Sequence, residues 1–203
     1  MSIAERRERQ KENLRRQIFD AASELFAEEG YRNVSMRKIA EKIDYSPTTI
    51  YLYFKDKAEL LRYICEETFA QLGRRIEEIT APETDSIEAL KKGLRAYVDF
   101  GLRYPNHYEV VFNMPVFSKN GNEKNGYEGS MGERAFEYLR SGVKDCVRDG
   151  KLKNGDIDLI SQTLWAGVHG LVSLFNNNPD FPFVEKNKLI DSTIETMING
   201  LKT

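Results

Sequence analysis

The sequence predicts an all-α protein, and three observations lead to this prediction. Apolar residues recur at steps of three and four positions in almost every segment, which is the period of a helix with one buried face. No stretch alternates apolar and polar residues for long enough to indicate a half-buried strand. The 203 residues include only 14 Gly and 6 Pro, and 40% of them are hydrophobic, so the chain can bury a core without disulfides or metals.

The first long helix is expected over residues 12–29. Leu14, Ile18 and Leu25 lie at helical spacing on one side, and Gly30 follows as a C-terminal stop. The N-terminal arm and the first turns of this helix together contain six basic and three acidic residues. Such an arm is often only the solvated start of a helix, but beside a DNA-binding motif it favours contact with backbone phosphates.

Two short helices follow, joined by a connection of about three residues. Ser35 is the expected N-cap of the first, over residues 36–43. Ser46 and Pro47 begin the second, which is expected to reach Phe54. Helices this short cannot bury their own faces, but with the first long helix beneath them they form a three-helix unit of the helix-turn-helix kind.

The exposed side of the second short helix indicates a nucleic-acid partner. Ile50 and Phe54 project together and are the expected buried pair, which turns other side chains outward. These outward or flanking side chains are Thr48, Thr49, Tyr51, Leu52 and Tyr53. An exposed leucine is costly in water but suits a major groove, where thymine methyl groups accept apolar contacts. Residues 32–57 carry a net charge of +3, although the whole chain carries −2.

The rest of the chain is expected to be helical as well. Asp56 is the predicted N-cap of a longer helix that runs to Glu78, and residues 81–86 end it with proline and turn-forming residues. Residues 118–127 are rich in Gly and Asn and form an expected polar loop. The other expected helices, which bring the total to about nine, cover residues 86–103, 106–114, 129–149, 156–176 and 184–201.

The last two long helices are expected to hold a homodimer, because each has more apolar surface than one partner can cover. A four-helix interface across a two-fold axis would bury the excess and place two recognition helices on successive major grooves. The residues assigned to this interface are Val168, Val172, Phe175, Ile190, Ile194, Met197, Ile198 and Leu201.

The run from Ser35 to Leu61, SMRKIAEKIDYSPTTIYLYFKDKAELL, closely resembles the DNA-binding domain of the TetR family of transcriptional regulators. Its most specific part is the spacing I-Y-x-Y-F-x-x-K-x-x-L that begins at Ile50 and joins the recognition helix to the helix after it. The resemblance implies that the chain binds a double-stranded DNA operator. Asp44 stands where the family commonly has glycine in the turn, and Asp tolerates the left-handed conformation needed there.

Position by position, the resemblance assigns roles around the second short helix. It implies that the major groove is met by Ser46, Pro47, Thr48 and Thr49, and that phosphates are bound by Tyr51, Tyr53 and Lys57. Lys57 lies in the first turn of a helix, where the dipole disfavours a cation, so an external anion would explain it. Arg37, from the local positive charge, and the exposed Leu52 complete the predicted DNA-binding residues.

The remainder of the chain resembles the family's all-helical ligand-binding and dimerisation domain. The segment Trp165-Ala-Gly-Val-His169-Gly170 is similar to a subgroup named for a Trp-His-Gly signature. A pocket for a small, largely apolar effector is expected among Phe69, Phe100, Phe112, Phe136, Trp165 and His169. A hydrogen-bonded core histidine is the alternative for His169, and ordinary core packing is the alternative for the phenylalanines.

These features predict two domains. Residues 1–56 form a helix-turn-helix DNA-binding domain with a basic N-terminal arm, and residues 57–203 form a helical effector-binding and dimerisation domain. The predicted function is that of a repressor, released from a palindromic operator when an effector displaces the helix that begins at Lys57. The alternative is a constitutive DNA-binding dimer, or a partner-binding module, that has no effector pocket.

Other function classes lack their motifs. There is no Gly-rich phosphate loop or nucleophile elbow, and the two histidines have no carboxylate or cysteine neighbours at metal-ligand spacing. Neither an enzyme nor a cofactor or metal is therefore expected. Residues 159–179 are uncharged but too polar to span a membrane, and the N-terminus lacks an apolar signal segment, so no membrane partner is expected. Cys65 and Cys146 are interpreted as reduced thiols of a cytoplasmic protein.

Overall fold

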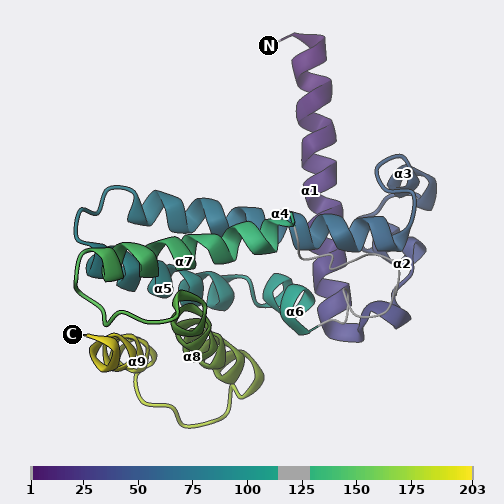
Figure 1. The fold of residues 1–203 in the computed structure, drawn as a ribbon. Coiled ribbons are helices and arrows are strands. Elements are labelled where there is room, and N and C mark those ends of the chain that lie inside the picture. The colour runs from purple at the N-terminus through teal and green to yellow at the C-terminus, as the bar shows by residue number, and fades with distance from the viewer. Residues whose placement is uncertain (1, 114–128, 203) are drawn as a thin grey trace. The chain divides into compact units, whose positions relative to one another are not determined.

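The computed structural model describes residues 2–113 and 129–202, and within these ranges the chain is helical, with no strand (Figure 1). The all-α prediction is confirmed, while the loop predicted over residues 118–127 lies outside the described residues. The described elements are α1 (Ile3–Glu29), the 3-10 turn η1 (Tyr31–Asn33), α2 (Met36–Lys42), α3 (Pro47–Tyr51), α4 (Lys57–Thr80), α5 (Ser86–Arg103), α6 (Pro105–Asn113), α7 (Met131–Arg148), α8 (Ile157–Asn177) and α9 (Lys186–Leu201).

The chain divides into two compact units. The first contains α1 to α3, the beginning of α4 up to Thr68, and α6 from Asn106 onward. The second contains the rest of α4 from Phe69, together with α5 and α7 to α9. The sequence predicts a boundary at residues 56/57, where α4 begins, whereas the two units divide inside this helix.

The first unit is built on one side of α1. Its core contains four completely buried residues of α1, α2 and α3, namely Ile18, Phe26, Ile39 and Ile50. α2 and α3 therefore each bury one side in the core that they share with α1. α1 begins at Ile3 rather than near residue 12, because a capping box orders its N-terminus. In this box Ser2 Oγ accepts from the Glu5 amide at 3.1 Å, and the Ser2 amide donates to Glu5 Oε2 at 2.7 Å.

The second unit is centred on α5, which packs against α7, α8 and α9. Val98, Val143 and Leu164 are completely buried at these contacts. α8 and α9 approach each other where Gly167 faces Met197. A Cβ atom built on Gly167 would lie 2.2 Å from Met197 Sδ, so this packing depends on the missing side chain.

The stripe predicted to form the dimer interface lies instead inside the second unit. Six of its eight residues are buried within a single chain, and Met197 and Leu201 are half-buried. The predicted interface requires that one partner cover each helix, whereas α8 packs on α5, α7 and α9, and α9 packs on α5 and α8. The six buried residues, which belong to the core of one chain, are Val168, Val172, Phe175, Ile190, Ile194 and Ile198.

None of the described helices is long and apolar enough to cross a bilayer. Likewise, no group of three His, Cys, Asp or Glu side chains in the described ranges is arranged to hold a metal ion.

Candidate nucleic-acid interface

The turn between α2 and α3 is fixed by two residues. Asp44 adopts φ 58°, which is the left-handed conformation expected of an Asp in this turn. Ser46 is the N-cap of α3, because its Oγ accepts from the Thr49 amide at 3.2 Å. The same Oγ lies 2.9 Å from Thr49 Oγ1, so the two hydroxyl groups share a hydrogen bond at the start of α3.

Leu52, the C-cap residue of α3, is an apolar side chain that the rest of the chain leaves almost completely exposed. Ile50 and Phe54 are buried as predicted, whereas Leu52 is 80% exposed and Tyr51 is 54% exposed. Of the other predicted DNA-contacting residues, Ser46 and Thr48 are exposed, and the half-buried ones are Pro47, Thr49 and Tyr53. This surface offers hydroxyl groups for bases or phosphates and an apolar tip for a thymine methyl group.

The basic residues around α2 differ in how they are held. Arg37 Nε pairs with Glu41 at 2.8 Å across one turn of α2, and both side chains are exposed. Exposed pairs of this kind contribute little to stability, so a phosphate can replace Glu41 at small cost. Lys42 pairs with Glu24 of α1 at 2.9 Å, and Lys38 pairs with Glu29 of α1. These two lysines therefore tie α2 to α1.

Lys57 has internal partners that sequence reasoning does not foresee. Its Nζ donates to the carbonyl oxygens of Tyr31 and Val34, both at 2.6 Å, and lies 4.3 Å from the centre of the Tyr31 ring. Burial lowers the pKa of Lys57 from its ordinary value. An external anion is therefore not needed to explain a cation at this helix start. Phosphate contact stays a prediction, because an ammonium group has a third N–H to donate.

In the second unit, three polar aromatic side chains form a hydrogen-bonded group. Trp165 Nε1 donates to Tyr97 Oη at 3.1 Å, and Tyr97 Oη lies 3.2 Å from His169 Nδ1. Phe136 of α7 meets Trp165 edge to face, with ring centres 6.1 Å apart. Burial lowers the pKa of His169, so its imidazole is neutral at pH 7. Tyr97 was missed by sequence reasoning, although it lies one turn before Phe100 on the buried side of α5.

The remaining predicted ligand-binding residues are more dispersed. Phe69 of α4 packs against α7 at Gly132, where a Cβ atom would lie 3.2 Å from the Phe69 ring. Phe100 is buried and its ring contacts Tyr104. Phe112 belongs to the first unit, where its ring contacts Tyr108. Of the six predicted residues, the structure thus brings Phe136, Trp165 and His169 into ring contact, with Trp165 between the other two.

The fold and the α2–α3 surface define a class of protein: a helix-turn-helix DNA-binding protein with a separate helical unit. Residues 18–64 match the family described as bacterial regulatory proteins, tetR family, and residues 90–198 match the tetracyclin repressor-like C-terminal domain. The chain belongs to the TetR family of bacterial DNA-binding transcriptional regulators.

Similarity to known proteins extends over nearly the whole chain. The Fatty acid metabolism regulator protein of Bacillus subtilis is 25% identical over 91% of this chain and 94% of its own length. The HTH-type transcriptional activator FasR of Mycolicibacterium smegmatis is 26% identical over 92% of this chain and 82% of its own. A TetR family transcription regulator from Marinobacter aquaeolei superimposes with a TM-score of 0.79, at 18% identity over 96% and 98% of the two chains.

Proposed function

We propose that this protein is a homodimeric transcriptional repressor, which a small, largely apolar effector releases from a palindromic DNA operator. The observation that carries the DNA-binding part is the exposed side of α3, where Leu52 and Tyr51 stand uncovered beside the capped turn at Ser46. A recognition helix enters a major groove with such a side, and two copies related by a two-fold axis read a palindrome.

The effector is proposed to bind beside Tyr97, Trp165 and His169. Ser161 lies one turn before Trp165 on α8; it is completely buried, and its hydroxyl has no hydrogen-bond partner in the described structure. Buried polar atoms are usually satisfied, so an orphan hydroxyl near polar aromatic side chains favours a site that a ligand completes. A neutral His169 and the Tyr97 hydroxyl suit an uncharged oxygen atom at the polar end of such a ligand.

Two similar proteins narrow the class of effector. The Bacillus subtilis relative is named a fatty acid metabolism regulator, and a solved structure from Bacillus halodurans is titled a fatty acid degradation regulator, with a TM-score of 0.74 at 20% identity over 92% of this chain and 95% of that one. These names favour an acyl chain as the first ligand to test. The aromatic side chains of Phe136 and Trp165 would pack against it.

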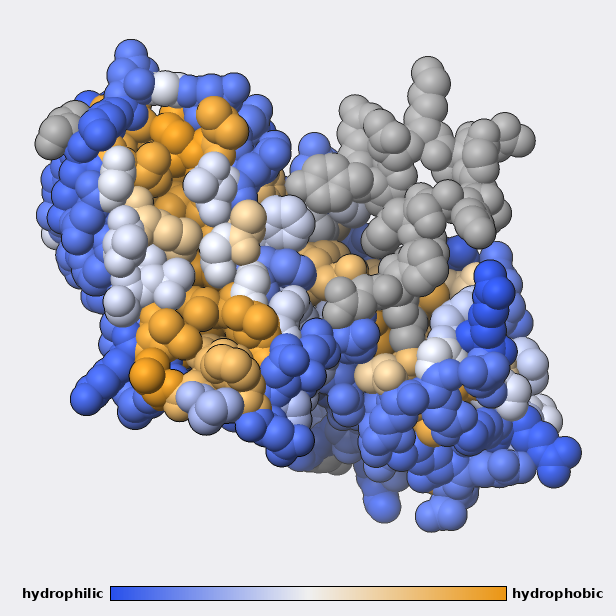
Figure 2. Space-filling view, turned by 90° about the horizontal axis from the view of Figure 1, so that it is seen from below, coloured by the Kyte–Doolittle hydropathy of each residue, from blue (hydrophilic) through white to orange (hydrophobic). Residues whose placement is uncertain are grey.

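The dimer is proposed to form through the side of α8 that the protomer leaves uncovered. Asp158, in the first turn of α8, is exposed and pairs with Arg140 of α7 at 2.6 Å. The other exposed residues of this helix, none of them charged, are Leu159, Gln162, Thr163, Ala166, Leu174 and Asn177. Leu159 and Leu174 are 65% and 49% exposed. Figure 2 shows apolar and weakly polar residues gathered over one face of the second unit, to which α8 belongs, with hydrophilic residues around them. A helix side of this kind suits a second copy of the same helix.

The switch is proposed to act through α4. An effector changes DNA affinity only when it binds one arrangement of the dimer better than another. α4 starts at Lys57 in the first unit and passes Phe69 in the second, so movement of its second part would be transmitted along a continuous helix. A coupling of about 1 to 3 kcal/mol would lower operator affinity roughly 5- to 150-fold.

The test begins with operators selected from random duplex DNA by the purified protein. Operator affinity is then measured by fluorescence anisotropy with a long-chain fatty acid, its acyl thioester and a short-chain acid as control. We expect a long-chain ligand to lower the affinity and Trp165→Leu to blunt this response while ligand-free binding persists. Operator binding that no ligand in a thermal-shift panel alters would favour the constitutive alternative. In vitro transcription gives the direction of regulation, since FasR is named an activator.

A further inference from the structure

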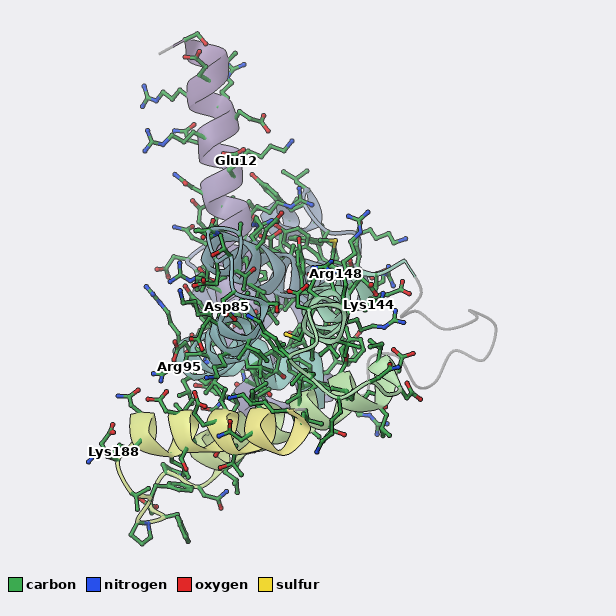
Figure 3. The ribbon with its side chains drawn as sticks, turned by 60° about the vertical axis from the view of Figure 1, so that its left-hand side comes forward. Glu12, Asp85, Arg95, Lys144, Arg148 and Lys188 are labelled. Carbon is green, nitrogen blue, oxygen red and sulfur yellow. The ribbon has the colours of Figure 1, made fainter. Side chains whose placement is uncertain are left out.

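The part of α1 from Ala4 to Asn13 has no buried side chain. All of these side chains are exposed, and burial begins at Leu14. In Figure 1 this part of α1 stands clear of α2, α3 and the start of α4, and Figure 3 shows its side chains, with Glu12 labelled, spread into solvent. An isolated helix of this length is marginally stable in water, so other interactions must stabilise this extension.

Two features order this extension. At its start, the capping box between Ser2 and Glu5 satisfies amide groups that a helix otherwise leaves unpaired. At its base, the guanidinium group of Arg15 lies 4.5 Å from the centre of the Tyr63 ring and 5.5 Å from that of Phe54. These contacts hold the helix where it leaves the core, and the extension therefore has a defined direction.

Charges are segregated around the extension. Ala4, Arg7 and Lys11 are spaced by three and four residues and are in line with the buried Leu14 and Ile18, so they continue the core-facing side of α1. This side contains no acidic residue.

The other charges form two further stripes at the same helical spacing. One stripe holds the acidic residues Glu5, Glu8 and Glu12, and the other holds Arg6 and Arg9, which continue toward Arg16. Among the described residues, neither Arg7 nor Lys11 forms an ion pair, whereas Arg16 pairs with Asp20 at 3.3 Å.

We propose that Arg7 and Lys11 bind backbone phosphates of DNA that flanks the sequence read by α3. Their stripe continues the side of α1 that packs against α2, and Arg15 at the base of the extension contacts Phe54, which follows α3. The stripe therefore lies on the side of α1 that faces the helix-turn-helix. Arg7 lies about 10 Å along the helix axis beyond Leu14, which is roughly three base-pair steps of a DNA strand. The two cations would extend the site outward without reading bases.

DNA is the partner that the charge pattern favours. The stripe offers two cations with no anion between them, which is complementary to a row of phosphates. An anionic membrane surface would meet the acidic stripe as well, because a helix lying on a membrane embeds a broad side. The contact presupposes the operator binding proposed above and adds to it a flank that α3 does not reach.

The test compares two matched double variants, Arg7→Ala/Lys11→Ala and Arg6→Ala/Arg9→Ala. Each removes two positive charges from adjacent turns of the extension, and alanine preserves the helix. Binding is measured by anisotropy over a range of salt concentrations, on a selected operator with long flanks and on the same operator cut to its core. On the long duplex, we expect the first variant to lower affinity and to reduce the salt slope by about one for each lost contact.

The outcomes separate the flank contact from the function proposed above. We expect Arg6→Ala/Arg9→Ala to leave the salt slope unchanged, and the core duplex to bind both variants and the unaltered protein alike. Equal losses for both variants would overturn the proposal in favour of net charge, and so would no loss for Arg7→Ala/Lys11→Ala on the long duplex. If the unaltered protein selected no duplex at all, the proposed operator binding itself would fail, and with it the flank contact.

Discussion

At the scale of single residues, Lys57 joins three parts of the DNA-binding unit. Its ammonium group, at the first residue of α4, holds the carbonyl groups of Tyr31 in η1 and Val34 just before the cap of α2. Hydrogen bonds to a charged donor are stronger than neutral ones, and those here are partly shielded from solvent. The position of α2 relative to α4 therefore depends on this side chain.

Lys57→Ala is expected to weaken both the fold and DNA binding. Loss of the two charge-assisted hydrogen bonds should lower the free energy of unfolding by about 1 to 3 kcal/mol, as measured by urea denaturation. Operator affinity should fall alike for every sequence, because phosphate contacts carry no base information. Lys55→Ala is the control, since Lys55 is exposed. Unchanged stability in Lys57→Ala would contradict the structural role.

The protonation of His169 makes the free energy of unfolding depend on pH. Its folded-state pKa is lowered below 6.5 by burial, so the unfolded chain takes up a proton at a higher pH than the folded one. This contribution is complete above the unfolded pKa and is lost as the pH falls through the folded pKa. We expect His169→Gln to lose less stability than the unaltered protein between about pH 7.5 and 5.5. If the urea midpoints of the two proteins fell by the same amount over this pH range, His169 would not contribute to the pH dependence.

Local signals predicted the caps but not the partners of these residues. Ser35, Ser46 and Asp56 cap the expected helices, because an N-cap bonds to an amide only two or three residues away. Lys57 instead bonds to residues 23 and 26 positions earlier, and Tyr97 bonds to residues 68 and 72 positions later. Contacts between distant positions depend on tertiary packing, which helical periodicity does not specify.

At the scale of elements, α8 shows that apolar periodicity predicts the bounds of a helix but not its neighbours. Its apolar spacing predicted the helix to within one residue at each end. The same spacing shows which sides of a helix are apolar but not how many neighbours cover them. Because α5, α7 and α9 all pack on α8, the stripe that contains Val168 and Val172 lies in the core of one chain. Only the exposed residues of α8 are left to face a second copy.

Gly167→Ala is expected to disturb the contact between α8 and α9. The added methyl group would lie 2.2 Å from Met197 Sδ, so the Met197 side chain must move out of its packing position. We expect a loss of about 1 to 3 kcal/mol in the free energy of unfolding, measured with urea.

The matched comparisons use the same two helices. Gly200→Ala in α9 meets nothing within 4 Å and should be neutral or stabilising through helix propensity. In the double variant Gly167→Ala/Met197→Ala, the clash is absent, so the two changes should cost less together than their separate losses predict. Strict additivity would show that the two side chains do not oppose each other.

At the scale of the whole molecule, dimer formation and DNA recognition should be separable by substitution. Leu174→Glu would place a charge on the uncovered side of α8, and we expect it to give a monomer by sedimentation and to weaken operator binding. Leu52→Glu would repel DNA at the tip of α3, and we expect it to abolish operator binding while the dimer persists. A dimer in Leu174→Glu would exclude this side of α8 as the interface.

The DNA-binding unit is discontinuous in sequence, and this limits how it can be transplanted. Leu60 and Ile64 of α4 and Tyr108 of α6 are buried, and the ring of His107 of α6 contacts that of Phe19 of α1 in a tilted arrangement, with ring centres 4.6 Å apart. A fragment ending at residue 56 would lack all four of these side chains. A chimaeric regulator that exchanges DNA specificity should therefore receive only the outward residues of α3, grafted onto an intact scaffold, rather than a head joined at the start of α4.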